Sequence, residues 1–337
     1  MPHQPIVKTC LMFIFITTFT SLLILFPNLA LDASVNGLHI WLDIVFPALF
    51  PFLIASELII RFGIAHFAGH FLDPLMRPLF GVRGIGAIAL FIGMISGYPA
   101  GAKVCADLRA KAYISQTEGE RLLAFTNNAS PLFIFGVIAI SFYSNELVGI
   151  FILLTHYLAN LFAGLSMRFY LWKKSPPPES HQRSFKDTLR TMHRIRLQNK
   201  LPIGHQFSHM ILQSVRTLCI IGGYIMLFSV ISQFVKAALG VFFEQIPLAL
   251  EPLLFGLFEM TIGIHHLAST DSLSLFIHIV IICLILSFNG LSVHAQVLSL
   301  ISESDLRYRA YFLGRVLHAF WSLLIVFGLS PVFLPYL

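Results

Sequence analysis

Two short polar motifs interrupt apolar stretches in the first half of this sequence, and both have residues suited to binding a solute. One is Gly97–Lys103 (GYPAGAK), and the other is Asn127–Pro131 (NNASP). Two adjacent amides and a hydroxyl are costly in hydrocarbon unless they find partners or water. Pro131 also frees a carbonyl one turn earlier. The second motif therefore predicts a helix opened for substrate contact, with helix–helix hydrogen bonding as the alternative.

The Gly97–Lys103 motif predicts a chain reversal at membrane depth. Pro99 has no N–H group, and Gly97 and Gly101 permit a tight turn. Irregular backbone inside a bilayer is tolerated only where protein or a water-filled cavity satisfies its polar groups. The alternative is an ordinary loop between two spanning helices.

The second half of the sequence has weaker counterparts of these motifs. The sequence NGLS at Asn289–Ser292 aligns with NNAS when Ser292 is set against Ser130, which indicates faint internal symmetry. Glu259 is the only acid in either predicted hairpin, and an ionisable group at membrane depth indicates a proton or cation function. Its alternative role is as an ion-pair partner of a nearby histidine or lysine.

From these motifs we predict a set of substrate-binding residues. The set is Gly97, Tyr98, Pro99, Gly101, Lys103, Asn127, Asn128, Ser130, Glu259, Gly263, Asn289 and Ser292. We expect no enzyme, because HExxH, GxSxG and phosphate-loop lysine motifs are absent. We expect no cofactor and no metal site, because the four cysteines are dispersed and the adjacent His265 and His266 would form a poor chelate.

The composition predicts the elements that must position these residues. Hydrophobic residues make up 57% of the 337 and charged residues only 11%, whereas soluble domains carry about 25% charged residues. We therefore predict an all-α polytopic membrane protein. Seven apolar segments are long enough to span a bilayer, and two shorter ones, 84–102 and 252–268, are expected to be re-entrant hairpins. The spanning segments are 9–30, 40–60, 121–143, 146–171, 214–238, 273–300 and 310–335.

A basic linker divides the chain into two halves. Residues 173–207 contain eight basic and two acidic residues. Short Lys- and Arg-rich loops stay cytoplasmic, and the absence of an accompanying aromatic platform argues against nucleic acid as the partner. The predicted organisation is a first transmembrane helix at 1–34, a first repeat at 35–172, the cytoplasmic linker at 173–207, and a second repeat at 208–337.

If the two hairpins enter from opposite faces, the halves are inverted repeats. This topology places 21 of the 22 basic residues on or near the inner side, with only Lys236 near the outer face. That distribution follows the positive-inside rule. If both short segments spanned the bilayer instead, Arg61, Arg77 and Arg83 would lie outside.

Three motifs together resemble one known family. Phe46–Phe52 (FPALFPF), Gly97–Lys103 and Asn127–Phe133 (NNASPLF) are similar to the sporulation integral membrane proteins of the YlbJ type, over about residues 35–335. That family carries nucleoside-recognition gate domains, which are also similar to parts of concentrative nucleoside transporters and ferrous-iron transporters. The resemblance implies a role in endospore formation, in the cell membrane or the outer forespore membrane. The implied cargo is dipicolinate, moved from the mother cell towards the forespore.

A dicarboxylate suits the predicted chemistry, because helix N-termini favour anions. Asn127, Asn128 and Ser130 would donate hydrogen bonds to it, and Lys103 would attract it. Two other functions stay open at this point, namely a transporter of nucleosides or divalent metal and a non-transporting scaffold of the sporulation membrane. The expected partners are a small-molecule substrate and the lipid bilayer, with homo-oligomer formation left open.

Overall fold

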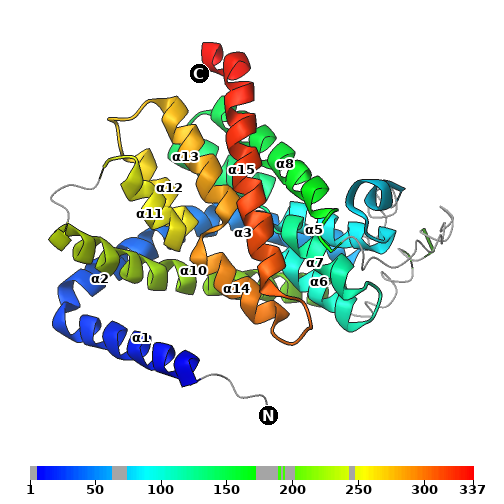
Figure 1. Cartoon of the computed structure of the whole chain (residues 1–337), viewed down its shortest axis with the longest axis horizontal. Coiled ribbons are helices and arrows are strands. Elements are labelled where there is room, and N and C mark those ends of the chain that lie inside the picture. Colours follow the sequence, from blue (N-terminus) through cyan, green and yellow to red (C-terminus); the bar gives the residue numbers. More distant parts are fainter. Residues whose placement is uncertain (1–5, 63–73, 172–188, 191–192, 194–201, 243–246) are drawn as a thin grey trace.

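The structure is a computed structural model that describes residues 6–62, 74–171, 189–190, 193, 202–242 and 247–337 (Figure 1). Most of the predicted linker 173–207 lies outside the described residues. The described chain is helical throughout, without strands, which confirms the predicted all-α class. The main elements are α1 (Ile6–Leu25), α2 (Pro27–His39), η1 (Ile40–Val45), α3 (Phe46–Arg61), α5 (Ala87–Ser96), α6 (Ala100–Ala110), α7 (Gln116–Phe125), η4 (Phe133–Phe142), α8 (Glu146–Met167), α10 (Ile203–Phe242), α11 (Leu250–Phe258), α12 (Met260–Ala268), α13 (Leu275–Phe288), α14 (Gly290–Ile301) and α15 (Tyr308–Phe333).

Five helical stretches of the described chain are long and apolar enough to cross a bilayer. They are Pro27–Ala55, Glu146–Met167, Gly204–Phe242, Leu275–Ile301 and Tyr308–Tyr336. Two of the seven predicted spans are not among these stretches. The segment 9–30 breaks at Pro27, which occupies the first turn of α2, a position where its missing N–H costs nothing. The segment 121–143 breaks between α7 and η4.

The same order of elements occurs before and after the linker. A pair of short helices (α5 and α6, or α11 and α12) is followed by an interrupted helix and then by a long one. The interrupted helices are α7–η4 and α13–α14, and the long ones are α8 and α15. In Figure 1, α8 and α15 cross the centre of the molecule, where they pack against each other and against α7 and α13.

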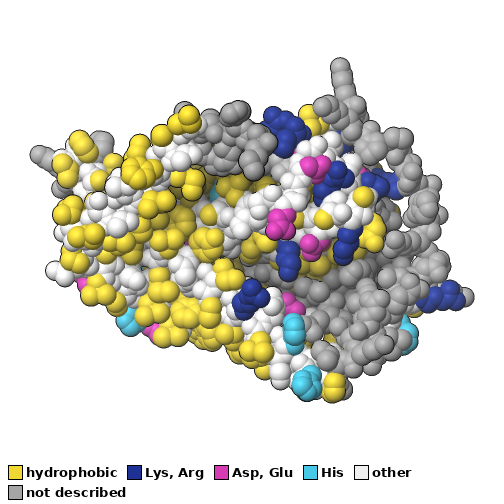
Figure 2. Space-filling view, turned by 90° about the horizontal axis from the view of Figure 1, so that it is seen from below, with side chains coloured by type: hydrophobic (Ala, Val, Ile, Leu, Met, Phe, Trp, Pro, Cys, Tyr) yellow, Lys and Arg dark blue, Asp and Glu magenta, His cyan; other side chains and the backbone are white. Residues whose placement is uncertain are grey.

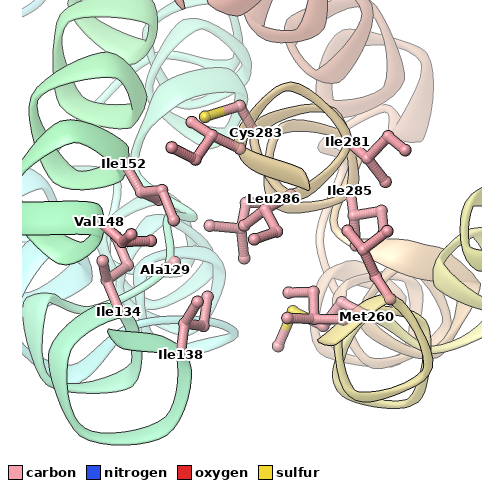
Figure 3. Packing of buried hydrophobic residues seen from close by; sticks show 14 of the residues in the cluster. Ala129, Ile134, Ile138, Val148, Ile152, Met260, Ile281, Cys283, Ile285 and Leu286 are labelled. Carbon is pink, nitrogen blue, oxygen red and sulfur yellow. The ribbon is translucent and has the colours of Figure 1, made fainter. Parts of the chain in front are cut away.

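The largest apolar core lies where the two parts of the chain meet. Figure 3 shows side chains of η4 and α8, among them Ile138 and Ile152, on one side and Ile281 and Ile285 of α13 on the other, with Leu286 between them. On the surface, most charged side chains in view lie towards one end, and hydrophobic side chains cover much of the rest (Figure 2). That distribution suits a bilayer around the apolar part.

Ion pairs join the first part to the loop between α14 and α15. Arg307 contacts Glu120 of α7, with its Nε 2.5 Å from Oε1 and its Nη2 2.6 Å from Oε2. Arg109 of α6 contacts Asp305 with two bonds of 2.8 Å, and this guanidinium holds the pKa of the Asp305 carboxyl below its ordinary value. The Glu120 side chain is fully buried, whereas that of Asp305 is half exposed.

We expect Arg307→Met to destabilise the protein by about 2 kcal/mol or more, because it leaves the buried Glu120 carboxylate without its cation. Arg109→Met is the matched control, and its exposed pair should contribute under about 1 kcal/mol. Denaturation of the purified protein in detergent measures both changes. Equal losses from the two variants would contradict this expectation.

Candidate functional site

A cavity of about 680 Å³ lies between the turns of both helix pairs, α3, α10 and α14, and we call it the inner cavity. It combines residues from both parts of the chain. Six of the twelve predicted site residues line it: Gly97, Tyr98, Pro99, Lys103, Ser130 and Glu259. The other six, Gly101, Asn127, Asn128, Gly263, Asn289 and Ser292, do not.

The turns of the two helix pairs touch at this cavity. Gly97 ends α5 with a φ of +74°, a left-handed conformation that glycine adopts at little cost. Tyr98 follows, and its hydroxyl donates to Sδ of Met260 at 2.9 Å. Met260 begins α12. The wall of the cavity is therefore continuous between the two turns.

Glu259 forms the turn between α11 and α12. Its Oε2 accepts a hydrogen bond from Ile262 N–H at 2.9 Å, and its Oε1 accepts one from the Thr261 hydroxyl at 3.4 Å. The residue is 3% exposed. A carboxylate at a helix N-terminus satisfies free N–H groups and is favoured by the helix dipole. The Glu259 carboxylate therefore occupies the N-terminus of α12, which is a position that favours an anion.

Asn127 joins the interrupted helix α7–η4 to α6. Its Oδ1 accepts from Ala102 N–H at 2.8 Å, and its Nδ2 donates to Leu123 O at 3.0 Å. The side chain thus caps the first turn of α6. Both ends of its amide are bonded inside the protein, and the residue does not line the inner cavity.

Two glycines allow this interrupted helix to approach the α5–α6 pair. The carbonyl oxygen of Thr126 lies between Gly93 and Gly101. A β-carbon added at Gly93 would lie 1.8 Å from that oxygen, and one added at Gly101 would lie 1.9 Å from it. Gly263 has a similar place in the other pair, where an added β-carbon would lie 2.4 Å from Cα of Gly256. Gly101 and Gly263 therefore permit close backbone packing.

The remaining predicted amides lie behind the cavity wall. Asn128 donates to Phe125 O at 3.1 Å, and Asn289 donates to Asn127 O at 3.3 Å and to the Tyr311 hydroxyl at 3.0 Å. Among the described residues, the Oδ1 atoms of Asn128 and Asn289 and the Oγ of Ser292 have no partner. Asn289 links the two interrupted helices directly, since its amide reaches the backbone of the first.

Residues of α8 and α15 bind the backbone at the first interruption, and none of them is among the predicted site residues. Arg315 donates to Ala124 O at 2.5 Å and to Asn127 O at 2.8 Å. Asn160 donates to Phe125 O at 2.8 Å, and Ala129 N–H donates to Nε2 of His156 at 3.1 Å. These contacts satisfy backbone groups that a break in a buried helix would leave unpaired.

A sequence signal for these residues does exist. Tyr311, Arg315, His318 and Ser322 recur at spacings of four, three and four in an otherwise apolar helix, so they share one face of α15. His156 and Asn160 lie four residues apart on α8, so they also share one face of their helix. A polar stripe of this kind marks the face that contacts another polar element within the membrane.

The polar lining of the inner cavity includes acidic, basic and neutral side chains. Glu57, Lys103, Asp107 and Glu259 line it, together with the amides of Gln213 and Gln296 and several hydroxyls. Lys103 and Asp107 are exposed, so the cavity reaches the surface beside them. Within the described chain, no group of three or more His, Cys, Asp or Glu is placed to hold a metal ion. The lining is suited to hydrogen bonding with a small polar solute.

Comparison with known proteins assigns the chain to a family. A family model described as nucleoside recognition (Gate) matches residues 42–143. The sporulation integral membrane protein YlbJ of Bacillus subtilis (strain 168) is 42% identical over 342 residues, covering 95% of this chain and 82% of that protein. The chain belongs to the YlbJ family of sporulation integral membrane proteins. No solved structure matches it.

The gate match covers a defined part of this YlbJ-family protein. Residues 42–143 run from η1 through the α5–α6 pair to the end of η4. They therefore include the Gly97–Pro99 turn and the interruption that holds Ser130. Glu259 and the amides on α10 and α14 come from outside the matched range, so the inner cavity is completed by the second part of the chain.

Proposed function

We propose that this YlbJ-family protein moves a small polar solute through the inner cavity during endospore formation. The observation that carries the proposal is the cavity itself, which is formed where the turns of two helix pairs meet at two interrupted helices. Solute sites of secondary transporters lie at the interface of structural repeats, beside interrupted helices. The proposed cargo is dipicolinate, moved from the mother cell across the outer forespore membrane.

We infer a topology in which α5–α6 and α11–α12 are re-entrant hairpins of inverted repeats. The matching order of elements in the two parts supports it. The distribution of basic residues, with 21 of 22 on one side, also supports it. The linker 173–207 is then cytoplasmic, on the side from which α10 begins.

The proposed roles follow from where the side chains lie. Lys103, at the exposed end of the cavity, attracts the carboxylates of the cargo. Ser130 and the amides of Gln213 and Gln296 hydrogen-bond to it. Glu259 holds a proton or cation that offsets the charge of the cargo. The interrupted helices are kept in position by the side chains of Asn127, Asn128, Asn289 and Ser292, which do not themselves bind the cargo.

Blocking the cavity tests the proposal. In proteoliposomes, the wild-type protein should give saturable dipicolinate uptake. Gln296→Trp, which fills the inner cavity from α14, should abolish it. Leu298→Trp is the matched control on the same helix, because Leu298 is 44% exposed and does not line the cavity. This control should transport normally. Uptake by Gln296→Trp at the wild-type rate would refute transport through this cavity.

A nucleoside is the second candidate cargo. The gate match and the two cavity amides favour it, because amide groups pair well with the hydrogen-bonding edges of bases. Adding nucleosides to the uptake assay separates the two cargoes. Inhibition of dipicolinate uptake by nucleosides, or nucleoside uptake alone, would transfer the function to this second candidate. A protein that moves neither solute, nor Fe²⁺, would fit the scaffold alternative.

A further inference from the structure

A second, smaller cavity is lined by Ile262, His265 and His266 of α12, whereas the start of that helix lines the inner cavity. It measures about 300 Å³ and shares no lining residue with the inner one. We call it the outer cavity. Its polar lining comes from α2, α10 and α12 and comprises Asp32, Asn36, Ser229, Gln233, Lys236, His265 and His266.

Two long helical segments line both cavities. Along α10, residues between His209 and Tyr224 line the inner cavity, and Ser229, Gln233 and Lys236 line the outer one. The α2–η1–α3 segment runs beside α10 in the opposite direction, with the Ser229 hydroxyl bonded to Ala33 O at 2.7 Å and the Trp41 indole bonded to Leu218 O at 2.8 Å. The two cavities therefore follow one another along this pair of segments.

A small apolar cluster separates the cavities, and we call it the seal. It consists of Ile40, Val45, Ile225, Phe255 and Ile262, each exposed by 6% or less. Val45 also lines the inner cavity, whereas Phe255 and Ile262 line the outer one. Ile225 follows directly after Tyr224, the last inner-cavity residue on α10.

The order of polar and apolar side chains along α10 is that of a passage closed at one point. On α10, polar side chains line each cavity, and Ile225 between them packs into the seal. An apolar constriction between two wetted cavities stops polar solutes and ions, because water leaves it. The turn at Glu259 leads directly into Ile262, so movement of the α11–α12 pair would change the seal and the inner cavity together.

We propose that the outer cavity is the far mouth of the translocation path and that the seal closes the path in this conformation. This inference rests on the proposed function. It assigns to the outer cavity the same small polar cargo, which meets an aspartate, a serine, two amides, a lysine and two histidines there. Lys236 and His266 both contact Glu251 beside this mouth.

Cysteine labelling tests the path independently of any cargo. Gln213 and Gln233 are a matched pair on α10, one in each cavity. In a Cys10→Ser, Cys219→Ser background the exposed native thiols are gone, and the remaining two are buried. In intact bacterial cells, a membrane-impermeant charged thiol reagent should label Gln233→Cys and leave Gln213→Cys unlabelled until the cells are permeabilised.

Opening the seal should then join the cavities. Ile225→Ser in the Gln213→Cys protein should raise the labelling rate in intact cells about tenfold or more, because a polar residue lets water into the constriction. Val230→Ser is the matched control, since Val230 is buried on the same helix in a different cluster, and it should have no effect. Ile262→Ser repeats the test from α12 if Ile225→Ser does not fold.

The outcomes separate this inference from the proposed function. Labelling of both cysteines from the same side, or no gain in labelling from either seal variant, would overturn the path. The expected labelling pattern together with absent dipicolinate uptake would keep the path and the seal and refute only the cargo.

Discussion

Gly101→Ala is expected to destabilise the protein by about 3 kcal/mol or more and to abolish transport. The added methyl would lie 1.9 Å from the Thr126 carbonyl oxygen. Backbone cannot rotate away as a side chain can, so the α5–α6 pair must move off the interrupted helix. That movement also breaks the hydrogen bond from Ala102 N–H to Asn127. Thermal unfolding in detergent and uptake in proteoliposomes measure the two losses.

Gly223→Ala is the matched control for this substitution. Gly223 is exposed on α10 and has nothing within 4 Å of an added β-carbon, so alanine there should be neutral or stabilise the helix by up to about 1 kcal/mol. Gly93→Ala should reproduce the Gly101 result, because it meets the same oxygen at 1.8 Å. A Gly101→Ala protein as stable and active as Gly223→Ala would show that the two elements do not pack in this way.

Glu259→Gln is expected to lower the initial rate of dipicolinate uptake about tenfold or more, the effect of losing about 1.4 kcal/mol of stabilisation in the rate-limiting state. Three acids line the inner cavity in the described chain, and only Glu259 is buried. Glutamine keeps an oxygen that can accept from Ile262 N–H, so the turn stays capped. What it loses is the ability to hold a proton or cation beside the cargo.

Glu146→Gln is the control for neutralising one carboxylate, because Glu146 lies exposed in the first turn of α8 and lines neither cavity. It should transport at the wild-type rate. Unfolding temperatures of both variants should remain close to that of the wild type, so that a loss of rate in Glu259→Gln reflects the site. Wild-type uptake by Glu259→Gln would exclude a charge-carrying role for this residue.

The helix breaks at 97–101 and 289–290 could be predicted from the sequence, because local residue types decide them, whereas the break at Pro27 was not predicted. Glycine and proline at 97–101 and Asn-Gly at 289–290 favour turns wherever they stand. In the structure the first turn lies at Gly97–Pro99, and Asn289 and Gly290 both have positive φ. The end of the first helix pair was harder to predict, since α6 continues to Ala110 through polar residues that an apolar criterion excludes.

The hydrogen-bond partners of the amide side chains could not be predicted in the same way. Asn127 and Asn128 were expected to face a solute, but in the structure they bond to backbone atoms of α6 and α7. An amide in hydrocarbon needs partners, and a sequence motif shows only that need. Which group meets it depends on elements far away, such as Arg315, which is 188 residues from the carbonyl of Asn127 that it binds.

The sequence by itself determined that this is an all-helical membrane protein of the YlbJ family, with helices interrupted at the Gly97–Lys103 and Asn127–Pro131 motifs and at Asn289. Composition, hydropathy and local backbone preference depend on a few neighbouring residues, so they can be read from the sequence without the tertiary structure. Only the tertiary structure decided that the turns at Tyr98 and Glu259 meet around one cavity, and that an apolar seal separates it from a second. Those arrangements arise from packing between residues more than a hundred positions apart, which no local preference encodes.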